Sequence, residues 1–259
     1  MAALFRKLFA RKKQPPLVCA VEIGPDGEPV GASPDHVHTD ACFISFESLS
    51  VAELFQSQSC SSCPPAIPPI QAATADPNTL LLTYSVTLFD HTGWKDTFSS
   101  ALADTRQRGY AKRWARTSIF TPQVVVNGVA DGSGPDKEAV LNIVSKAKED
   151  RHHRDFNIYV DSNDAEVRID TSKQEITPHD VLIVTFNTDD QVVKVLRGPN
   201  KGKKINHRNV VRDVQRIGEW RGGNWTFPLP VPRSSYQGLG AVVLVQEANS
   251  GPIVAAAKI

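Results

Sequence analysis

The chain has 259 residues, of which 41% are hydrophobic and 22% are charged, and its formal net charge is +1. This composition is typical of a globular protein with one large or two modest domains, and Lys and Arg are too evenly spread to indicate a nucleic-acid partner. No apolar run approaches the roughly 20 residues that a membrane-spanning helix needs, so a transmembrane segment is not expected.

Residues 1–16 form a basic, acid-free tail that ends at two prolines. In a helix, its leucines and phenylalanines would share one face, which is also typical of a mitochondrial presequence or a membrane-surface helix. No secretory signal precedes the four cysteines, and these are too few to staple a chain of this length. We therefore expect a reducing, cytoplasmic compartment, with a mitochondrial location or attachment to a membrane surface through the tail as alternatives.

Residues 17–48 are expected to form an N-terminal arm with a short strand followed by a polar loop. The loop contains His36, His38 and Cys42, a combination of side chains that ligate zinc in other proteins. Structural zinc sites usually draw on two paired ligand groups, and the chain has no second Cys-x-x-Cys pair to complete one. We therefore expect a polar loop here and no metal site.

Between residues 49 and 152 the pattern predicts alternating strands and helices. The apolar run over 80–86 is typical of a strand covered on both faces. Asp96 is the expected N-cap of a helix, and Asn127-Gly128 predicts a hairpin turn. The predicted strands cover residues 49–55, 80–86, 123–126 and 129–131, and the predicted helices cover residues 60–75, 97–115 and 136–148.

The sequence Cys60-Ser61-Ser62-Cys63 follows the first of these strands and is expected to begin the first helix. Backbone N–H groups at the start of a helix stabilise a thiolate, so Cys60 is predicted to be acidic and exposed. Cys63 lies one turn inward and is predicted to be buried, where it would resolve a mixed disulfide formed by Cys60.

After residue 152 the pattern changes to short alternating runs separated by turn residues, which predicts an all-β domain with a sandwich-like arrangement over residues 153–259. The stretch 209–220 fits a helix and a strand equally well. Residues 198–204 resemble a phosphate-binding loop only in composition, because the Gly-Lys-Ser/Thr ending is missing. The predicted strands cover residues 156–160, 165–169, 181–187, 192–196, 241–246 and 253–258.

The order of elements, with a Cys-x-x-Cys at the start of the first helix, resembles the thioredoxin fold. The chain is also similar to a thioredoxin-like family of unknown function, whose members are often secreted in bacteria and are also present in eukaryotes. The resemblance implies an α/β thioredoxin-like fold (βαβαββα) over residues 49–152, followed by the small all-β domain. It rests on the strings at residues 53–65, 93–98, 106–111 and 121–128, and it extends over most of residues 50–259.

The resemblance also implies functional residues. Pro122 would follow a cis peptide bond and face the two cysteines, and the backbone of Thr121 would pair with an extended substrate. Glu53 is a candidate for proton transfer to the resolving cysteine, as in thioredoxins, with a structural hydrogen-bonding role as the alternative. Apart from the resemblance, His91 and Trp94 follow the second predicted strand and are candidates for lining a substrate groove. The alternatives are that His91 is solvated and that Trp94 packs in the core.

Two functions from different classes fit these residues. The chain is either a thiol-disulfide oxidoreductase that uses Cys60 and Cys63, or a non-catalytic thioredoxin-like module for binding or redox sensing. The first needs no cofactor beyond a redox-active Cys60–Cys63 disulfide, and its partner would be a protein or a small thiol or disulfide. The two serines between the cysteines carry no charge, so the motif does not indicate the direction of the reaction.

Overall fold

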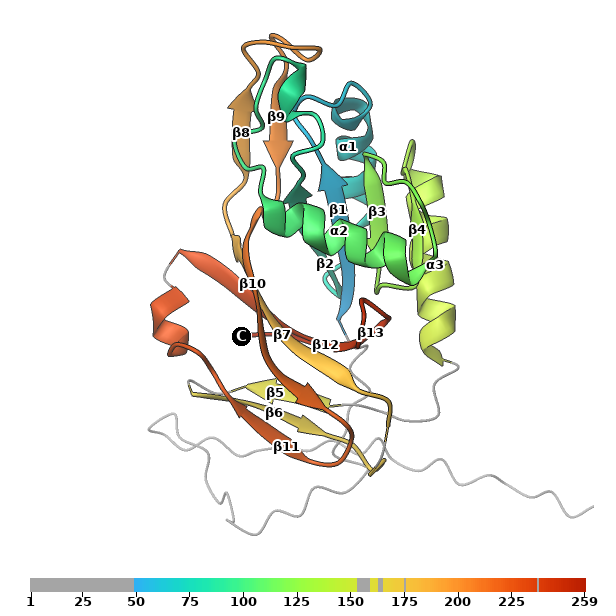
Figure 1. Cartoon of the computed structure of the whole chain (residues 1–259), viewed down its shortest axis with the longest axis vertical. Coiled ribbons are helices and arrows are strands. Elements are labelled where there is room, and N and C mark those ends of the chain that lie inside the picture. Colours follow the sequence, from blue (N-terminus) through green and yellow to red (C-terminus); the bar gives the residue numbers. More distant parts are fainter. Residues whose placement is uncertain (1–48, 153–158, 163–164, 175, 237) are drawn as a thin grey trace, which may run out of the picture. The chain divides into compact units, whose positions relative to one another are not determined.

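The computed structural model describes residues 49–152, 159–162, 165–174, 176–236 and 238–259. In this part the protein is a mixed α/β structure with several sheets, in which an N-terminal sheet with helices is followed by a β-rich part (Figure 1). The predicted tail, the arm, Cys19, Cys42 and the His-x-His pattern lie outside the described residues.

The N-terminal sheet is built around β1, all seven residues of which are buried. Its side chains alternate between two cores, because successive residues of a strand point to opposite faces. Val51 and Phe55 belong to one core cluster, and Ala52 and Leu54 belong to the other. The sheet has the order β2-β1-β3-β4, with β1 (Ser50–Gln56) parallel to β2 (Thr79–Ser85) and antiparallel to β3 (Gln123–Val126), which pairs with β4 (Ala130–Gly132).

Helices cover both faces of this sheet. Residues of α1 and α3 pack in the cluster that contains Ala52 and Leu54, whereas α2 contributes to the cluster on the opposite face. The order of strands and helices is the one predicted from the sequence, and the Asn127-Gly128 turn is confirmed, with a positive φ at both residues. The helices are α1 (Cys63–Ala73), η2 (Asp90–Thr92), α2 (Ala101–Arg113) and α3 (Lys137–His152).

Two predicted helix starts are wrong. The first helix begins at Cys63 instead of Cys60, because residues 60–62 form a turn that precedes it. The second begins at Ala101 instead of residue 97, with Ser100 as its N-cap, whose hydroxyl accepts a hydrogen bond from Ala103 N–H at 3.2 Å. The carboxylate of the predicted cap, Asp96, instead accepts hydrogen bonds from the backbone N–H groups of Gln58 and Phe98.

The C-terminal part contains nine strands in three sheets and one short 3-10 helix among the described residues. The ambiguous stretch 209–220 is strand β10, and β9 and β11 were not predicted. The strands are β5 (Tyr159–Ser162), β6 (Glu166–Asp170), β7 (His179–Asn187), β8 (Gln191–Lys194), β9 (Lys204–His207), β10 (Val211–Trp220), β11 (Trp225–Pro228), β12 (Leu239–Glu247) and β13 (Ile253–Lys258), and the short helix is η3 (Arg233–Tyr236).

In the four-stranded sheet β10-β7-β12-β13, strands β7, β12 and β13 contribute to core clusters on both faces, whereas most of the edge strand β10 is exposed or half-buried. On one face, Leu182 and Leu244 join the core cluster that contains β1 and α2. On the other, Ile183 and Val243 pack with residues of the three-stranded sheet β11-β6-β5. The described residues from 49 onward belong to one compact unit, with a core that both halves share. The domain boundary between residues 152 and 153 stays a prediction.

Candidate functional site

Cys60 and Cys63 lie where β1 leads into α1, and both are free thiols. The Cys60 N–H donates to the Ser57 carbonyl at 3.1 Å, and the Cys63 N–H donates to the Cys60 carbonyl at 3.3 Å. Pro64 and Pro65 follow in the first turn of α1, where a missing N–H removes no helical hydrogen bond. This turn places the two sulfurs next to each other at the N-terminus of the helix.

The two thiols have opposite pKa shifts. A hydrogen bond from the Cys63 thiol is the largest cause that lowers the pKa of Cys60 to about 6, and the backbone N–H groups of Ser62 and Cys63 lower it further. Burial raises the pKa of Cys63 far above its ordinary value, and the adjacent Cys60 sulfur adds to that effect. At neutral pH the site therefore holds a Cys60 thiolate beside a protonated Cys63.

The prediction that Cys60 is exposed is wrong. Only 4% of Cys60 is accessible, compared with none of Cys63, although the intervening Ser61 and Ser62 are exposed. Cys60 is covered because it faces the chain before β3, where its sulfur lies 3.5 Å from the Thr121 carbonyl oxygen, which accepts a hydrogen bond from the thiol in its protonated form. Cys60 thus has the lowered pKa predicted for it, but its side chain is almost completely covered.

Thr121 and Pro122 lie next to Cys60, and the peptide bond between them is cis, as the resemblance implied. The segment is held from α2 by the Gln107 amide, which donates to the Phe120 carbonyl and to the Gln123 side-chain oxygen, both at 2.8 Å. The sheet fixes its other end, since Gln123 begins β3 and pairs with Phe55. The cis-proline and the cysteines are therefore brought together by two independent elements.

Asn200, in the loop between β8 and β9, braces the cysteine turn from the C-terminal part. Its side chain is fully buried, and its amide donates to the carbonyl of Gln58 at 2.8 Å and to that of Cys60 at 2.7 Å. Its side-chain oxygen accepts a hydrogen bond from the Lys203 ammonium at 2.9 Å. Asn200 thus joins a solvent-exposed lysine to the backbone of the reactive thiol through one amide group.

Gln58 and Asp96 form a second brace on the other side of the turn. The Asp96 carboxylate accepts from the Gln58 N–H at 2.7 Å and from the Phe98 N–H at 2.8 Å. Burial raises the pKa of Asp96 to about 6, against the lowering effect of these N–H donors. The Gln58 side-chain oxygen in turn accepts from the Trp94 indole N–H at 2.8 Å. The segment before Cys60 is therefore fixed by buried polar contacts.

His207 at the end of β9 completes this buried network. Its ring nitrogens lie within hydrogen-bond distance of the side-chain amides of Gln56 and Gln58, at 2.5 and 3.2 Å. The ring also packs edge-on against Phe98, with centroids 5.3 Å apart. Burial lowers the pKa of His207 to about 4, so the ring is neutral at pH 7 and serves as a hydrogen-bonding group.

Glu53 is fully buried in β1, but it contacts neither thiol through a hydrogen bond recorded among the described residues. Its carboxylate receives two hydrogen bonds from Arg106 and one from the Tyr110 hydroxyl. Arg106 also donates to the Gln246 side-chain oxygen at 3.1 Å, which joins α2 to β12. This arrangement supports the structural alternative for Glu53 over the proton-transfer role.

His91 and Trp94 lie in the segment that follows β2. His91 is exposed in η2, as expected for a solvated histidine. Trp94 is partly buried and packs against the core cluster beneath α1, and its carbonyl accepts from the Ser59 hydroxyl. The structure thus brings Trp94, but not the His91 ring, into the framework that holds the cysteine turn.

Three residues of this framework escaped the sequence analysis: Asp96 as a partner of Gln58, Asn200 and His207. Asn200 lies in the stretch dismissed as a phosphate-binding loop, and His207 lies just before the ambiguous stretch 209–220, at a position where no element was predicted. No local pattern marks either residue, because their partners in the cysteine turn are 140 or more positions away in the sequence. The signals that the sequence offered for this framework were Asp96 and Trp94, which follow the predicted strand over residues 80–86.

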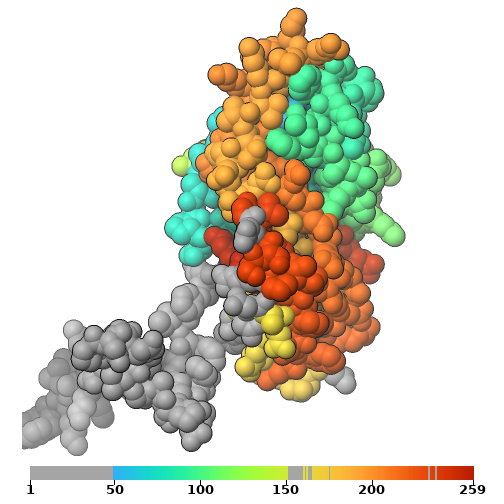
Figure 2. All heavy atoms as spheres, turned by 90° about the vertical axis from the view of Figure 1, so that its left-hand side faces the viewer, coloured from blue at the N-terminus to red at the C-terminus, as the bar shows by residue number. Residues whose placement is uncertain are grey.

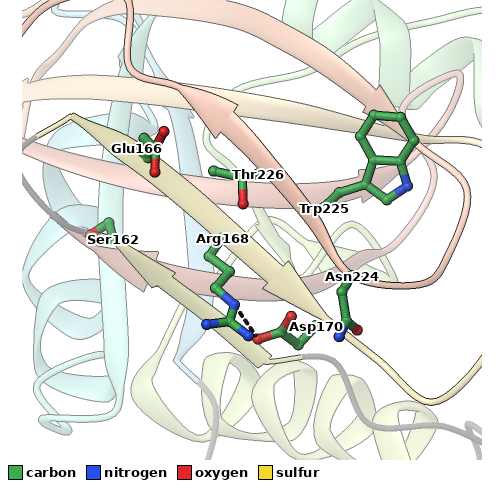
Figure 3. Close-up of a pocket in the computed structure, with 7 residues that line it drawn as sticks. All are labelled: Ser162, Glu166, Arg168, Asp170, Asn224, Trp225 and Thr226. Atoms are coloured by element: carbon green, nitrogen blue, oxygen red, sulfur yellow. Dashed lines mark ion pairs between the residues drawn. The ribbon is translucent and has the colours of Figure 1, made fainter. Parts of the chain in front are cut away.

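The surface also has two hollows away from the cysteines. One of about 450 Å³ lies over the exposed face of β6, where Arg168 and Asp170 form an ion pair at 2.9 Å (Figure 3). The other, of about 600 Å³, adjoins the edge strand β4 and contains the ion pair between Arg116 and Asp131. Neither hollow is lined by a residue of the cysteine turn.

Within the described part of the chain, no three His, Cys, Asp or Glu side chains are grouped as metal ligands would be. The search for membrane spans, made over the same part, found no helix with the length and hydropathy to cross a bilayer.

Residues 51–246 match a protein family described as "Protein of unknown function (DUF1223)". The matched region contains both cysteines, the cis-proline, Asn200 and His207. Because it spans more than half of the sequence, the chain belongs to this family. A comparison with curated proteins gave no match.

Two solved structures are similar to this chain. A crystal structure of an Agrobacterium tumefaciens protein from a structural genomics consortium is 28% identical, with a TM-score of 0.66, and the alignment covers 83% of this chain and 96% of that one. HBP35 of Porphyromonas gingivalis is 12% identical, with a TM-score of 0.54, and the alignment covers 83% of this chain and 76% of that one. The second similarity concerns the fold alone.

Proposed function

We propose that the protein is a thiol-disulfide oxidoreductase in which Cys60 is the nucleophile and Cys63 the resolving thiol, built on a thioredoxin-like fold over residues 49–152. The observation that carries this proposal is the asymmetry of the two thiols. Cys60 has a pKa of about 6 and receives the hydrogen bond of Cys63, whose own pKa is raised by burial. A nucleophilic thiol whose pKa lies near the ambient pH combines a high thiolate fraction with retained nucleophilicity.

The proposed reaction has two exchange steps. The Cys60 thiolate attacks one sulfur of a substrate disulfide, forms a mixed disulfide, and releases the other substrate sulfur as a thiolate that takes up a proton from water. Cys63 then loses its proton and attacks the Cys60 sulfur, which forms the Cys60–Cys63 disulfide and releases the second substrate thiol. Two electrons pass from the dithiol to the substrate, and a thiol or dithiol reductant restores the enzyme.

The surroundings of the cysteines support this sequence of steps. The Ser62 and Cys63 N–H groups stabilise the Cys60 thiolate before it attacks the substrate disulfide. Thr121 and Pro122 border the nucleophile, so a substrate segment that reaches Cys60 passes over them. The proposal assigns Thr121 the backbone contact to that segment, and the cis-proline next to it offers no N–H of its own.

One observation favours a second function. Cys60 is only 4% accessible, whereas reactive cysteines are usually at least partly exposed. A binding or redox-sensing module would keep its thiols covered in this way and expose them only on a conformational change. This second function predicts partners that are held without a covalent bond.

Trapping of mixed disulfides distinguishes the two functions. In Cys63→Ser the nucleophile remains but resolution is blocked, so disulfide-linked adducts at Cys60 should accumulate in a cell extract and disappear with dithiothreitol. Cys60→Ser provides the matched control, because it replaces the other sulfur of the same turn and should give no adducts. Partners common to the wild type and both variants, unaffected by reductant, would contradict the oxidoreductase and support the binding module.

A further inference from the structure

The end of the β8–β9 hairpin is strongly cationic. Residues 191–207 contain five lysines and arginines and no acidic residue. All five side chains belong to exposed residues; three of them lie in the connecting loop, and the other two are the last residue of β8 and the first residue of β9. The cations are Lys194, Arg197, Lys201, Lys203 and Lys204.

This loop is attached directly to the cysteine turn. Asn200, between the cations, donates to the Cys60 carbonyl, and Lys203 donates to Asn200. Gly198 lies against the segment after β2, because a Cβ added there would be 3.3 Å from the Trp94 Cβ. Figure 2 shows the hairpin, in orange, beside that segment, in blue-green. The charges on the loop are therefore held close to the reactive sulfur by packing and by hydrogen bonds.

Few acidic groups oppose these cations around the turn. Residues 54–75 carry no charge, and Lys95 adds an exposed cation next to Trp94. Asp96 is buried, and its carboxylate accepts a hydrogen bond from a backbone N–H group. Asp90 accepts hydrogen bonds from the Asp96 N–H and the Ser99 hydroxyl. At the opposite end of β8, Asp190 is engaged by Asn206 and Arg208. The β8–β9 loop thus carries exposed cations, and neither this loop nor the cysteine turn has an acidic residue of its own.

We propose that the substrate of the Cys60 site is an acidic polypeptide segment, which binds along the cationic β8–β9 loop as its sulfur reaches Cys60. This inference rests on the proposed oxidoreductase function and adds its substrate class. A polypeptide is favoured over a small acidic thiol because apolar side chains are exposed beside the charges: Leu196 is 57% accessible next to Arg197, and Phe120 is 38% accessible next to Thr121. A peptide offers apolar side chains that pack on such exposed groups, whereas a small thiol acid does not.

The charges act mainly on the rate of encounter. A surface of one sign raises the local concentration of an oppositely charged substrate and accelerates association by one to three powers of ten at low ionic strength. Salt removes this advantage, because the screening length falls to about 3 Å at 1 M. A preference for acidic substrates that disappears with salt is therefore the signature of this surface.

Two peptides of equal length test the proposal. Each carries one cysteine activated as a mixed disulfide with pyridine-2-thiol, flanked in one peptide by glutamates and in the other by glutamines. The Cys60 thiolate displaces pyridine-2-thione, a neutral leaving group whose absorbance reports the rate. With the reduced full chain at low salt, we expect the glutamate peptide to react about tenfold faster, and the two rates to converge near 1 M salt.

Charge-reversed variants locate the effect. The triple variant Arg197→Glu, Lys201→Glu and Lys204→Glu leaves Lys203 on Asn200 and should invert the peptide preference. The matched control reverses three other exposed cations, on α2 and β13, and should keep the wild-type preference. The control substitutions are Arg108→Glu, Lys112→Glu and Lys258→Glu.

Each outcome is decisive. A salt-sensitive preference for the glutamate peptide that only the loop variant inverts supports the proposal. Equal rates for both peptides, or inversion by the control variant as well, would overturn it. Glutathione disulfide reacting as fast as the glutamate peptide, with the same salt dependence, would overturn the choice of a polypeptide. If neither peptide nor the uncharged hydroxyethyl disulfide reacts at Cys60, the oxidoreductase function itself fails.

Discussion

The buried pair of Arg106 and Glu53 offers a sharp test of what holds the two halves of the protein together. Glu53 is fully buried and the Arg106 side chain is only 8% accessible. Arg106 also donates to Gln246 of β12, so the pair connects β1, α2 and the C-terminal sheet. We expect the Arg106→Met variant to lose much of the stability of the whole unit.

The size of the loss follows from what the substitution leaves behind. A methionine fills much of the same volume, but the Glu53 carboxylate loses both hydrogen bonds from the guanidinium and keeps the one from the Tyr110 hydroxyl. Removing one member of a buried ion pair costs about 3–5 kcal/mol, mostly because the remaining charge is buried without compensation. The matched control is Arg113→Met, because Arg113 lies on the same helix and pairs with Glu247 while 39% of its side chain is accessible. An exposed pair of this kind contributes about 0–1 kcal/mol.

Urea unfolding of both variants at pH 7, followed by circular dichroism, measures the two free energies. A second variant, Glu53→Gln with Arg106→Met, removes the stranded charge and should recover part of the loss. If Arg106→Met costs no more than Arg113→Met, or if the double variant is less stable than Arg106→Met alone, the account of this network is refuted.

Two further predictions concern the braces of the cysteine turn. Folding lowers the pKa of His207 from 6.5 to about 4. Between these pH values the ring is protonated in the unfolded chain but neutral in the native protein, so the free energy of unfolding decreases as the pH falls. Unfolding titrations should therefore show the wild type losing about 3 kcal/mol relative to His207→Gln between pH 7 and 4, at about 1.4 kcal/mol per pKa unit, and a constant difference would contradict this. Asn200→Ala removes the side-chain donor of the Gln58 carbonyl and one of the two donors of the Cys60 carbonyl, which should cost about 2 kcal/mol and speed amide exchange over residues 58–63. Asn206→Ala, which removes an exposed hydrogen bond of the same hairpin, should do neither, and equal effects of the two substitutions would rule out the brace.

The sequence was sufficient for the parts of the fold that local patterns specify. The all-buried strands β1 and β2 appear as apolar runs, and the Asn127-Gly128 turn has the dipeptide that a positive φ favours. The start of α2 was misplaced because its capping residue was inferred from its type alone. Asp96 has the side chain of an N-cap, but its carboxylate accepts from the Gln58 N–H, a contact that only the folded chain creates.

The candidate site was predictable in its chemistry and only partly in its geometry. The spacing of Cys60 and Cys63 indicated a dithiol, and the resemblance placed Pro122 beside it. The burial of Cys60 was not predicted, because the cover comes from Thr121, and Asn200 fixes the same turn from the C-terminal part. Such contacts depend on how distant segments pack, and no pattern within either segment encodes them.

The acidity of Cys60 is the central claim, and the pH dependence of its alkylation measures it most directly. Iodoacetamide labelling of the reduced chain, quantified at Cys60 by peptide mass spectrometry, should follow a titration with a midpoint near pH 6. In Cys63→Ala the midpoint should rise toward the ordinary thiol value of about 8.5, since the largest cause of the lowered pKa is gone, whereas Cys63→Ser keeps a donor and should fall between the two. A wild-type midpoint near 8.5, or one that Cys63→Ala leaves unchanged, would contradict the account.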